Sequence, residues 1–471
     1  MTNDNDRPQH DGLPSGWVWT TLDEITVFAQ NGFGKRRSEH GNPTVVLRLA
    51  DIARDGIALD DVRRIKVNEE EIEKYKLLED DLLCIRVNGS REQVGRLIRF
   101  SSASEPLLFC DHFIRFRLKD SRISKYLSLY VRTEPARKYI ESRMVSTAGQ
   151  NTISQSTLAK IPIPLAPLDE QHRIVAKIEE LFTRLDAGVA ALKRAQANLK
   201  RYKASVLKAA CEGKLVEQDT NDEPASELLK RILAERRAKW AADLRAKGKD
   251  PQKAKYEEPQ APDLDALPEL PKGWCCVQLE LVADVVDAHP SHRTPSEVVG
   301  GVPYVGMGDV EKDGRINREK ARKVAQEVLD EHQSRYQLKD GDFIFGKIGT
   351  VGKPVKLTSP FDYAVSANVI LVQPNQSNID SAYLFAYMAS PIAEKLLLKK
   401  SVATTQAAFG ILKARLFPVP LPPLAEQRRI VAEVERRLSV VQELEATLAA
   451  NLARAERLRQ SILKRAFEGK L

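Results

Sequence analysis

Long apolar segments are missing from this chain of 471 residues. No run approaches the roughly 18 consecutive apolar residues that a membrane-spanning helix needs. Cysteine is scarce and scattered, and an odd number of thiols without a paired C-x-x-C spacing indicates reduced cysteines and no metal site. The five are Cys84, Cys110, Cys211, Cys275 and Cys276. Residues 1–12 are polar and lack the apolar core of a signal peptide, which predicts a disordered tail on a cytoplasmic protein.

Catalytic signatures are also missing from the sequence. The nearest candidate for a phosphate-binding loop, residues 346–354, has the wrong spacing and places Pro354 where a Ser or Thr should bind magnesium. There is no Asp/Asn-Pro-Pro-Tyr/Phe tetrad of adenine methyltransferases, and the seven histidines form no H-x-x-x-H pair. The Glu-Gly-Lys segments at 212–214 and 468–470 resemble a nuclease pair, but capping of a helix end explains them better. The sequence therefore predicts a chain without a catalytic or metal site.

A strong excess of one charge is lacking as well. Lys and Arg number 73 against 65 Asp and Glu, which gives a net charge of +8. This moderate excess is weak support for nucleic acid binding by itself. It permits a phosphate-contacting surface if the basic residues are clustered.

The chain contains two copies of one unit. Three segments of the first half return in the second: 13–17 (Leu-Pro-Ser-Gly-Trp) at 270–274, 167–171 (Pro-Leu-Asp-Glu-Gln) at 423–427, and 212–215 (Glu-Gly-Lys-Leu) at 468–471. The offset is 256 or 257 residues throughout. A period of this length indicates a duplicated domain and not a solenoid. Well-preserved segments beside diverged ones suggest two related but different ligands.

Each copy ends in a segment with helical periodicity. From Leu168 and from Leu424 the apolar positions step by three and four over about six heptads, which is typical of a coiled-coil seam. A proline-rich approach precedes each segment, and Gly213 and Gly469 suit a left-handed C-cap. At ~1.5 Å per residue, about 44 residues form a rod of roughly 65 Å. We expect the two helices to pair within the chain; the alternative is that each packs on its own globular domain.

The predicted fold class is α+β, with two similar globular domains separated by two long helices in an intramolecular antiparallel coiled coil and an internal pseudo-twofold repeat. Short β-rich runs and Asp-Gly turns in both diverged parts support one shared topology. A linker helix from about Pro224 to Lys247 is basic, so it either contacts DNA or presents a solvated face. The predicted divisions are a disordered tail (1–12), domain 1 (13–160), long helix 1 (161–216), a helical and Pro-rich linker (217–269), domain 2 (270–416) and long helix 2 (417–471).

Polar, basic loops in both domains are candidates for DNA contacts. Arg and Lys can read guanine, and Asn and Gln can read adenine, in the major groove. The alternative for each residue is an ordinary solvated loop. The candidates are Lys35, Arg36, Arg37, Arg86, Asn88, Ser90, Arg91 and Gln150 in domain 1, and Ser291, His292, Arg293, Thr294, Lys347, Thr350, Lys353 and Gln406 in domain 2.

Taken in order, the repeated segments and the Pro-Ala-Ser-Glu-Leu-Leu block at 224–229 resemble the specificity subunit of type I restriction–modification enzymes. The resemblance covers essentially the whole chain. It implies two target recognition domains, each reading one half of a split, asymmetric double-stranded DNA site, with the coiled coil setting the spacer. It also implies a non-catalytic subunit.

The same resemblance implies partners and cofactors. Two modification subunits would methylate adenine with S-adenosylmethionine, and two restriction subunits would use ATP and magnesium to translocate and cleave DNA. By analogy, the segments that support docking of the modification subunits contain Glu170, Gln171, Arg173, Glu426, Gln427 and Arg429.

Other functions stay open at this point. A stand-alone duplicated DNA-binding regulator would need the domains but no docking surface on the helices. A coiled-coil adaptor would not need basic loops on both domains. A nuclease or methyltransferase would need a catalytic cluster that the sequence does not reveal.

Overall fold

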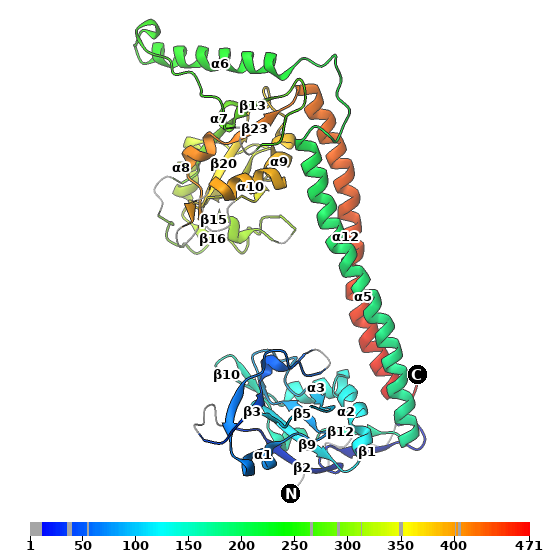
Figure 1. The fold of residues 1–471 in the computed structure, drawn as a ribbon. Coiled ribbons are helices and arrows are strands. Elements are labelled where there is room, and N and C mark those ends of the chain that lie inside the picture. The colour runs from blue at the N-terminus through cyan, green and yellow to red at the C-terminus, as the bar shows by residue number, and fades with distance from the viewer. Residues whose placement is uncertain are drawn as a thin grey trace. The chain divides into compact units, whose positions relative to one another are not determined.

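The computed structural model describes residues 12–34, 40–53, 56–263, 267–289, 293–311, 313–347, 352–400, 402–403 and 407–471 (Figure 1). The chain divides into two units, Met1–Arg194 with Leu448–Leu471, and Ala195–Thr447. Each unit holds one globular domain, the beginning of the long helix that follows this domain, and the end of the other long helix. We call residues 12–167 domain 1 and residues 270–423 domain 2. Among the described helices, none has the length and apolar character that a membrane span requires.

Domain 1 contains twelve described strands: β1 (Val18–Thr21), β2 (Thr26–Asn31), β3 (Asn42–Leu47), β4 (Arg64–Val67), β5 (Leu82–Ile85), β6 (Val87–Asn88), β7 (Leu97–Arg99), β8 (Leu107–Phe109), β9 (Phe113–Leu118), β10 (Val145–Thr147), β11 (Gln150–Thr152) and β12 (Pro162–Leu165). They form a four-stranded sheet in the order β2-β9-β5-β7, two three-stranded sheets, β4-β3-β8 and β10-β11-β6, and the pair β1-β12. The α-helices are α1 (Glu69–Tyr75), α2 (Ser124–Tyr130), α3 (Glu134–Ser142) and α4 (Gln155–Ala159).

Domain 2 repeats this topology. Its strands are β13 (Cys275–Gln278), β14 (Ala283–Asp287), β15 (Val302–Val305), β16 (Arg322–Val324), β17 (Phe343–Gly346), β18 (Pro354–Lys356), β19 (Ala364–Val365), β20 (Val369–Pro374), β21 (Val402–Ala403), β22 (Ala407–Ala408) and β23 (Pro418–Leu421). The order β14-β20-β17-β18 corresponds to β2-β9-β5-β7, and the order β16-β15-β19 corresponds to β4-β3-β8. The helices are α7 (Leu279–Val282), α8 (Gln326–Arg335), α9 (Ser381–Met388), α10 (Pro391–Lys400) and α11 (Ile411–Arg415). The predicted fold class, two α+β domains of one topology, is confirmed.

The aspartates that recur in both domains have structural roles. Asp81 and Asp342 stand directly before the fully buried central strands β5 and β17. Their carboxylates accept hydrogen bonds from the backbone N–H groups of Leu78 and Lys339, each at 2.8 Å. Because a buried carboxylate needs such donors, these aspartates fix the turn that leads into each central strand. Their repetition in the sequence therefore reflects the fold.

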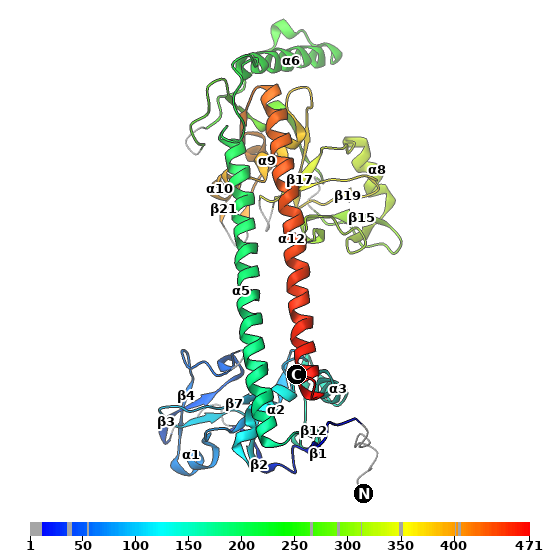
Figure 2. The ribbon, with the colours of Figure 1, turned by 90° about the vertical axis from the view of Figure 1, so that its right-hand side faces the viewer.

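The two long helices are α5 (Leu168–Cys211) and α12 (Leu424–Phe467), and within each unit their parts run antiparallel side by side (Figures 1 and 2). In unit 1, the beginning of α5 contacts the end of α12, where Arg459 forms an ion pair with Asp186 and lies 4.4 Å from the ring centre of Phe182. In unit 2, the end of α5 and the beginning of α12 share one hydrophobic core. The predicted pairing of the helices is therefore confirmed, and both helices also pack on the globular domains.

The predicted seam is nearly complete. In α12, all seam positions from Val431 to Ala466 are buried or half-buried. In α5, the steps of three and four also pass through the polar residues Gln196 and Lys203, and both are exposed. Their long polar side chains keep their hydration, and the small residues Ala195 and Ala204 beside them are half-buried instead.

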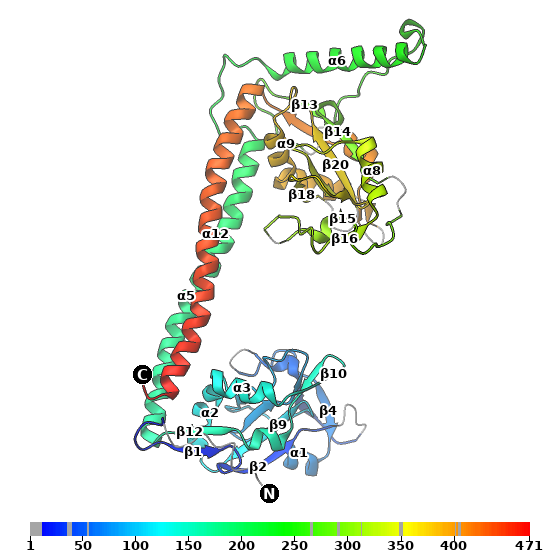
Figure 3. The same cartoon turned by 180° about the vertical axis from the view of Figure 1, so that it is seen from behind.

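The proline-rich approach to each long helix is an extended strand. β12 pairs with β1 and β23 pairs with β13, so the Leu-Pro-x-Gly-Trp segment and the proline-rich segment meet in each copy. Proline lacks an N–H group, but its carbonyl oxygen still needs a donor when it is buried. Tyrosine hydroxyls supply these donors: Tyr126 to Pro164 and Tyr130 to Pro162 in unit 1, and Tyr383 to Pro420 and Tyr387 to Pro418 in unit 2. The tyrosines lie on α2 and α9, between the sheet of each domain and the helix pair (Figure 3).

Each domain is completed by the end of the other copy's helix. In unit 1, Tyr126 and Tyr130 pack around Phe467, and their ring centres lie 4.9 and 5.3 Å from the ring centre of Phe467. In unit 2, Cys211 at the end of α5 is buried in the core that contains Tyr383 and Tyr387. Burial raises the pKa of the Cys211 thiol to about 12, so this thiol is neutral and behaves as an apolar group. Each core therefore contains residues from both copies of the repeat.

The helix ends need glycine. Gly213 and Gly469 have φ values of +66° and +68°, which confirms the predicted left-handed C-caps. They also lie against the Leu-Pro-x-Gly-Trp segments. A Cβ atom on Gly213 would lie 2.3 Å from Pro271 Cγ, and one on Gly469 would lie 2.5 Å from Pro14 Cγ. Conformation and close packing therefore both exclude a side chain at these two positions.

The linker helix is α6 (Ala225–Ala246), close to the predicted range. Its first half is anchored by Leu228 and Ile232, which are buried in the core of unit 2. Its second half packs on the segment that follows it, where Trp240 meets Tyr256 edge to face at 5.1 Å.

Unit 2 contains a buried carboxylate beside the first turn of α12. Glu426 is 1% exposed, and Trp274 donates its indole N–H to Glu426 Oε2 at 3.0 Å. Burial raises the pKa of the Glu426 carboxyl, and the Trp274 hydrogen bond and the nearby Arg429 oppose this effect. In unit 1, the counterpart Glu170 is half-buried and the buried Trp17 N–H has no hydrogen-bond partner among the described residues. The two copies therefore differ in the burial and hydrogen bonding of this glutamate.

We predict that Glu426→Gln stabilises the protein at pH 8, because the amide keeps an acceptor for Trp274 and removes a buried charge. A carboxyl whose folded pKa is raised costs stability above that pKa and costs nothing once it is protonated. The gain over wild type should therefore shrink as the pH falls toward 4 in thermal unfolding. Glu426→Ala leaves the indole N–H without an acceptor and should cost about 1–3 kcal/mol. The matched control is Glu170→Gln; a gain for Glu426→Gln that is independent of pH would contradict this account.

Candidate nucleic-acid interface

The described candidate residues of domain 1 lie at one end of its central sheet. β2 ends at Asn31, β5 ends at Ile85, and Arg86 links β5 to β6. The backbone of Arg86 is fixed on both sides, since its N–H donates to His112 O at 2.8 Å and its carbonyl accepts from Ile153 N–H at 3.0 Å. Its guanidinium group is half-buried and has no hydrogen bond or ion pair with another described residue. A rigid backbone therefore presents an unneutralised cation.

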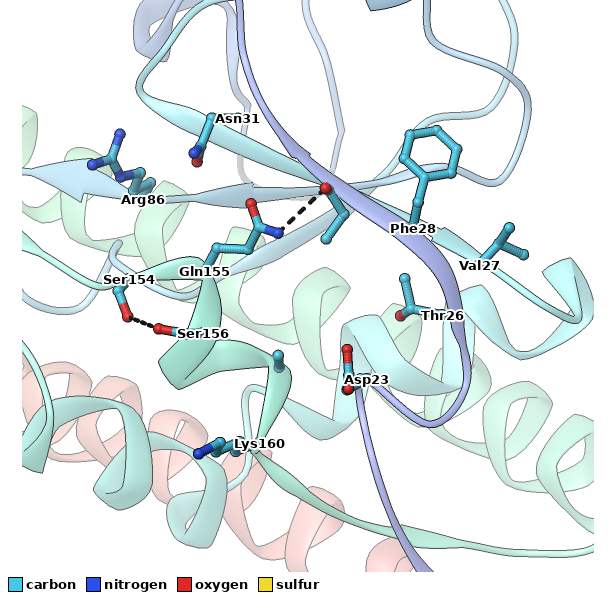
Figure 4. Close-up of a pocket in the computed structure, with 12 residues that line it drawn as sticks. Asp23, Thr26, Val27, Phe28, Asn31, Arg86, Ser154, Gln155, Ser156 and Lys160 are labelled. Carbon is cyan, nitrogen blue, oxygen red and sulfur yellow. Dashed lines mark hydrogen bonds between the residues drawn. The ribbon is translucent and has the colours of Figure 1, made fainter. Parts of the chain in front are cut away.

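Arg86 lines an open cavity of about 590 Å³ (Figure 4). Asn31, Gln155 and Lys160 line the same cavity, and Gln155 donates its amide N–H to Ala29 O at 3.3 Å. The lining thus combines two cations with amide and hydroxyl groups, and Asp23 contributes the one carboxylate among the lining residues. These groups suit an anionic phosphate or the polar edge of a base.

A short exposed sheet extends this end of domain 1. β11 pairs with both β6 and β10, so Asn151 stands opposite Asn88. Asn88 Oδ1 accepts from the Ser90 N–H at 2.8 Å, and Asn151 donates to Gly89 O at 2.9 Å. These bonds give the loop a defined shape. Gln150 is exposed beside the turn of the β10–β11 hairpin, so the structure brings it together with Asn88 and Ser90.

The hairpin turn and Arg91 frame this surface. Ala148 and Gly149 both have positive φ values, 49° and 78°, as a tight two-residue hairpin turn requires. Arg91 is exposed, and its guanidinium group lies 3.4 Å from Glu141 O. Lys35, Arg36 and Arg37 lie outside the described residues. In the sequence they follow β2 by four to six residues.

Domain 2 presents the equivalent end of its sheet with a different charge arrangement. Lys347 occupies the place of Arg86, since its N–H donates to Asn368 O and its carbonyl accepts from Phe409 N–H, each at 2.8 Å. Its ammonium group forms an ion pair with Asp287 at 2.9 Å, and the two side chains are 12% and 20% exposed. Asp287 ends β14 as Asn31 ends β2. Lys347, which was predicted to contact DNA, therefore forms an internal ion pair in this structure.

The other candidates of domain 2 are at its surface or outside the described residues. Arg293, Thr294 and Lys353 are exposed. The carbonyl of Arg293 lies 3.1 Å from His289 Nε2. Four candidates fall outside the described residues: Ser291, His292, Thr350 and Gln406.

Two histidines anchor the segment that contains Arg293. His289 Nδ1 lies 3.0 Å from His332 Nε2, and the Tyr336 hydroxyl lies 2.9 Å from His332 Nδ1. Burial, together with the neighbouring His289 and Arg335, lowers the pKa of His332 to about 4. His332 is therefore neutral at physiological pH, and the hydrogen bonds that join Tyr336, His332 and His289 hold this end of β14.

Sequence reasoning missed Asn31, Gln155, Lys160 and Asp287. A signal for one pair was present, because positions 31 and 287 are 256 residues apart and therefore correspond in the repeat. The cavity residues Gln155 and Lys160 carry no such signal, since α4 diverges: the counterparts in domain 2 are Ile411 and Leu416.

The residues predicted to support partner docking are divided by burial. Gln171, Glu426 and Gln427 are buried, each 3% exposed or less. Gln171 donates to Ala166 O, and Gln427 donates to Pro422 O and accepts from Asp380 N–H. These hydrogen bonds join each long helix to its own domain, and the docking role of these residues stays a prediction.

The remaining three are nearer the surface. Arg173 is exposed and Glu170 is half-buried. Arg429 is half-buried and forms an ion pair with Asp222 at 2.6 Å. This pair joins α12 to the segment that precedes α6.

Comparisons with known proteins agree with this arrangement. The family model described as the type I restriction modification DNA specificity domain matches residues 14–193 and 271–453. The StySPI specificity subunit of Salmonella potsdam is 36% identical over 230 residues, which cover 47% of this chain and 50% of that protein. The EcoBI specificity subunit of Escherichia coli is 23% identical over 468 residues, covering 98% of this chain and 87% of that protein. The matches to the StySPI and EcoKI subunits span about half of the length of those relatives.

Two solved structures share the fold. The HsdS subunit from Thermoanaerobacter tengcongensis superimposes with a TM-score of 0.50, and the match covers 98% of both chains at 20% identity. The second structure is described as showing complex assembly and conformational transition of the type I R-M system. A chain of it superimposes with a TM-score of 0.61 at 20% identity, and the match covers 98% of this chain and 99% of that one. Because the family model matches both copies of the repeat, the chain belongs to the family of the type I restriction modification DNA specificity domain, and it carries that domain twice.

Proposed function

We propose that this chain is the DNA-recognition subunit of a type I restriction–modification complex and has no catalytic role of its own. Each domain reads one half of an asymmetric, bipartite double-stranded DNA site. The observation that carries the proposal is the duplicated sheet end: in both domains a basic residue follows the central strand, beside the strand end at Asn31 or Asp287. Loops at this place differ between the domains, which is what two different half-sites require.

The helix pair provides the spacing between the half-sites in this proposal. Both long helices contain 44 residues, and each contributes its beginning to one unit and its end to the other. A paired helix resists bending and stretching, so the number of residues in it limits the number of base pairs between the two domains. A stand-alone DNA-binding regulator would need the two domains, but it would need neither long helices of equal length nor a docking surface for partner subunits on them.

The proposed partners are two modification subunits, which carry S-adenosylmethionine, and two restriction subunits, which use ATP and magnesium. The cofactors are assigned to those subunits and not to this chain. Exposed Arg173 and the surface around Glu170 at the beginning of α5, with Arg429 at the beginning of α12, are the proposed docking residues for the modification subunits. We place the assembled complex in the cytoplasm.

We predict that the purified chain neither methylates nor cleaves DNA. With a modification subunit and S-adenosylmethionine, adenine methylation should appear at one split motif, measured by sequencing modified bases in plasmid DNA. The control is the modification subunit without this chain. Methyl transfer by the chain alone would contradict the non-catalytic assignment.

We predict that the two domains are separable readers, because each has its own core and its own loops. Replacement of residues 13–160 by the equivalent domain of a relative should change one half of the methylated motif. The matched control replaces residues 270–416 and should change the other half. A simultaneous change of both half-sites in either chimera would be incompatible with modular reading.

We predict that the helix pair acts as a ruler. One heptad adds about 10 Å of helix at ~1.5 Å per residue, or about three base pairs at ~3.4 Å each. A heptad inserted after Leu199, with a second after Val441 in the facing helix, should lengthen the gap in the methylated motif and leave both half-sites unchanged. Insertion of one or two residues should instead disrupt the seam and lower the thermal stability. An unchanged gap in an active complex would show that the helices do not set the spacing.

A further inference from the structure

Arg86 and Lys347 occupy one structural position in the two domains. Both follow the central strand directly, and their backbone groups make the same pair of hydrogen bonds. Position 31 in domain 1 and position 287 in domain 2 correspond in the same way, since Asn31 stands opposite Ile114 and Asp287 opposite Ile370 in equivalent ladders. The repeat therefore offers a natural comparison of one cation with and without an acidic neighbour.

In domain 2 the cation is neutralised. Lys347 Nζ lies 2.9 Å from Asp287 Oδ2, and both side chains are less than a quarter exposed. Asp287 Oδ1 is buried and has no hydrogen-bond partner among the described residues, so Lys347 is the cation on which this carboxylate depends. A move of Lys347 to a DNA phosphate would leave that buried charge unpaired, which is unfavourable.

In domain 1 the cation is free of such a partner. Asn31 supplies a neutral amide where domain 2 has a carboxylate, and both Asn31 and Arg86 line the open cavity (Figure 4). No hydrogen bond or ion pair joins the Arg86 guanidinium group to another residue that the structure describes. Arg86 can therefore bind a phosphate or a guanine edge without breaking an existing interaction.

We propose that position 31/287 determines whether the cation at position 86/347 takes part in DNA binding. Asn31 leaves Arg86 available, and Asp287 withholds Lys347 from DNA. This inference rests on the proposed DNA-reading function, and it adds a residue pair that makes the two half-site contacts unequal. The side chain at 31/287 acts through its neighbour, so it is a positioning residue and needs no contact with DNA.

The first test uses domain 1 in the full chain, assembled with modification subunits, on DNA that carries the methylated motif. Arg86→Ala should weaken binding by about 5- to 150-fold, the range of one bidentate contact of about 1–3 kcal/mol. If the contact is to phosphate, the salt slope should also fall by about one unit. If it is to guanine, one base position should become relaxed. Asn31→Asp should reproduce this loss, because the new carboxylate would pair with Arg86; the neutral variant Asn31→Ser is the control.

A double variant separates the indirect effect from direct repulsion of DNA by a new negative charge. In the Arg86→Ala background, Asn31→Asp should cause little further loss if it acts through Arg86. An equal loss in both backgrounds would overturn the proposed mechanism. The folded state of each variant is checked by thermal unfolding before the binding measurement.

The reciprocal test uses domain 2. Asp287→Asn should release Lys347, tighten binding and steepen the salt slope by up to about one unit. The gain should disappear in Asp287→Asn/Lys347→Met, where the pair is neutral on both sides. A gain that persists in that double variant would show that Lys347 is not involved.

The two proposals fail in different ways. If the wild-type complex does not distinguish its motif from unrelated DNA, the proposed function is wrong. If the wild-type complex does so and neither Arg86→Ala nor Asn31→Asp changes affinity, salt slope or base preference, the function stands and the inference about position 31/287 is wrong.

Discussion

The packing of each domain against the end of the other copy's helix is the constraint on which the structure depends. In unit 1, Phe467 fills the space between Tyr126 and Tyr130, and the hydroxyls of these tyrosines hold the strand that leads into α5. In unit 2, Cys211 takes the corresponding place. Neither core is complete without residues that are distant in the sequence, since 341 positions separate Phe467 from Tyr126 and 172 separate Cys211 from Tyr383. A cut between the copies would therefore separate core residues and not merely a linker.

The same constraint explains which sequence segments recur. The strand after each Leu-Pro-x-Gly-Trp segment pairs with the proline-rich strand, and the Glu-Gln segment joins that strand to the helix. The glycine of each Glu-Gly-Lys-Leu segment packs on the Leu-Pro-x-Gly-Trp segment of the other copy. All of them belong to one joint. The loops at the far end of the central sheet have no part in it, so they are free to diverge between the copies.

Much of the fold could be predicted because its signals are local or repeated. The steps of three and four in α5 and α12, the glycine caps and the paired aspartates before β5 and β17 are visible in the sequence. The sequence does not reveal that three polar residues are buried: Gln171, Glu426 and Gln427. A polar residue at the start of a helix can form a hydrogen bond within the chain or contact a partner protein, and the sequence does not distinguish the two. The exposed seam positions Gln196 and Lys203 show the same limit.

The candidate site was predictable in place but not in detail. Arg86 and Lys347, both predicted from basic loops, lie at the corresponding end of each central sheet. The ion pair of Lys347 with Asp287 could not be predicted, because it joins residues 60 positions apart, on strands separated by a third strand. Only the register of the sheet shows that Arg86 and Lys347 are equivalent and that their neighbours differ in charge. Charge balance at a site depends on pairs of residues that are distant in sequence, and composition does not contain this information.

The central claim is that each domain reads its own half of the DNA site. Site-specific photocrosslinking tests this claim most directly. Gln150 and Lys353 are exposed at the corresponding ends of the two domains. A photoreactive amino acid at position 150, and separately at position 353, is introduced into the full chain, and the crosslinked nucleotides are mapped on DNA that carries the complex's motif. The account predicts crosslinks from position 150 to one half-site and from position 353 to the other. Crosslinks from both positions to the same half-site would contradict it.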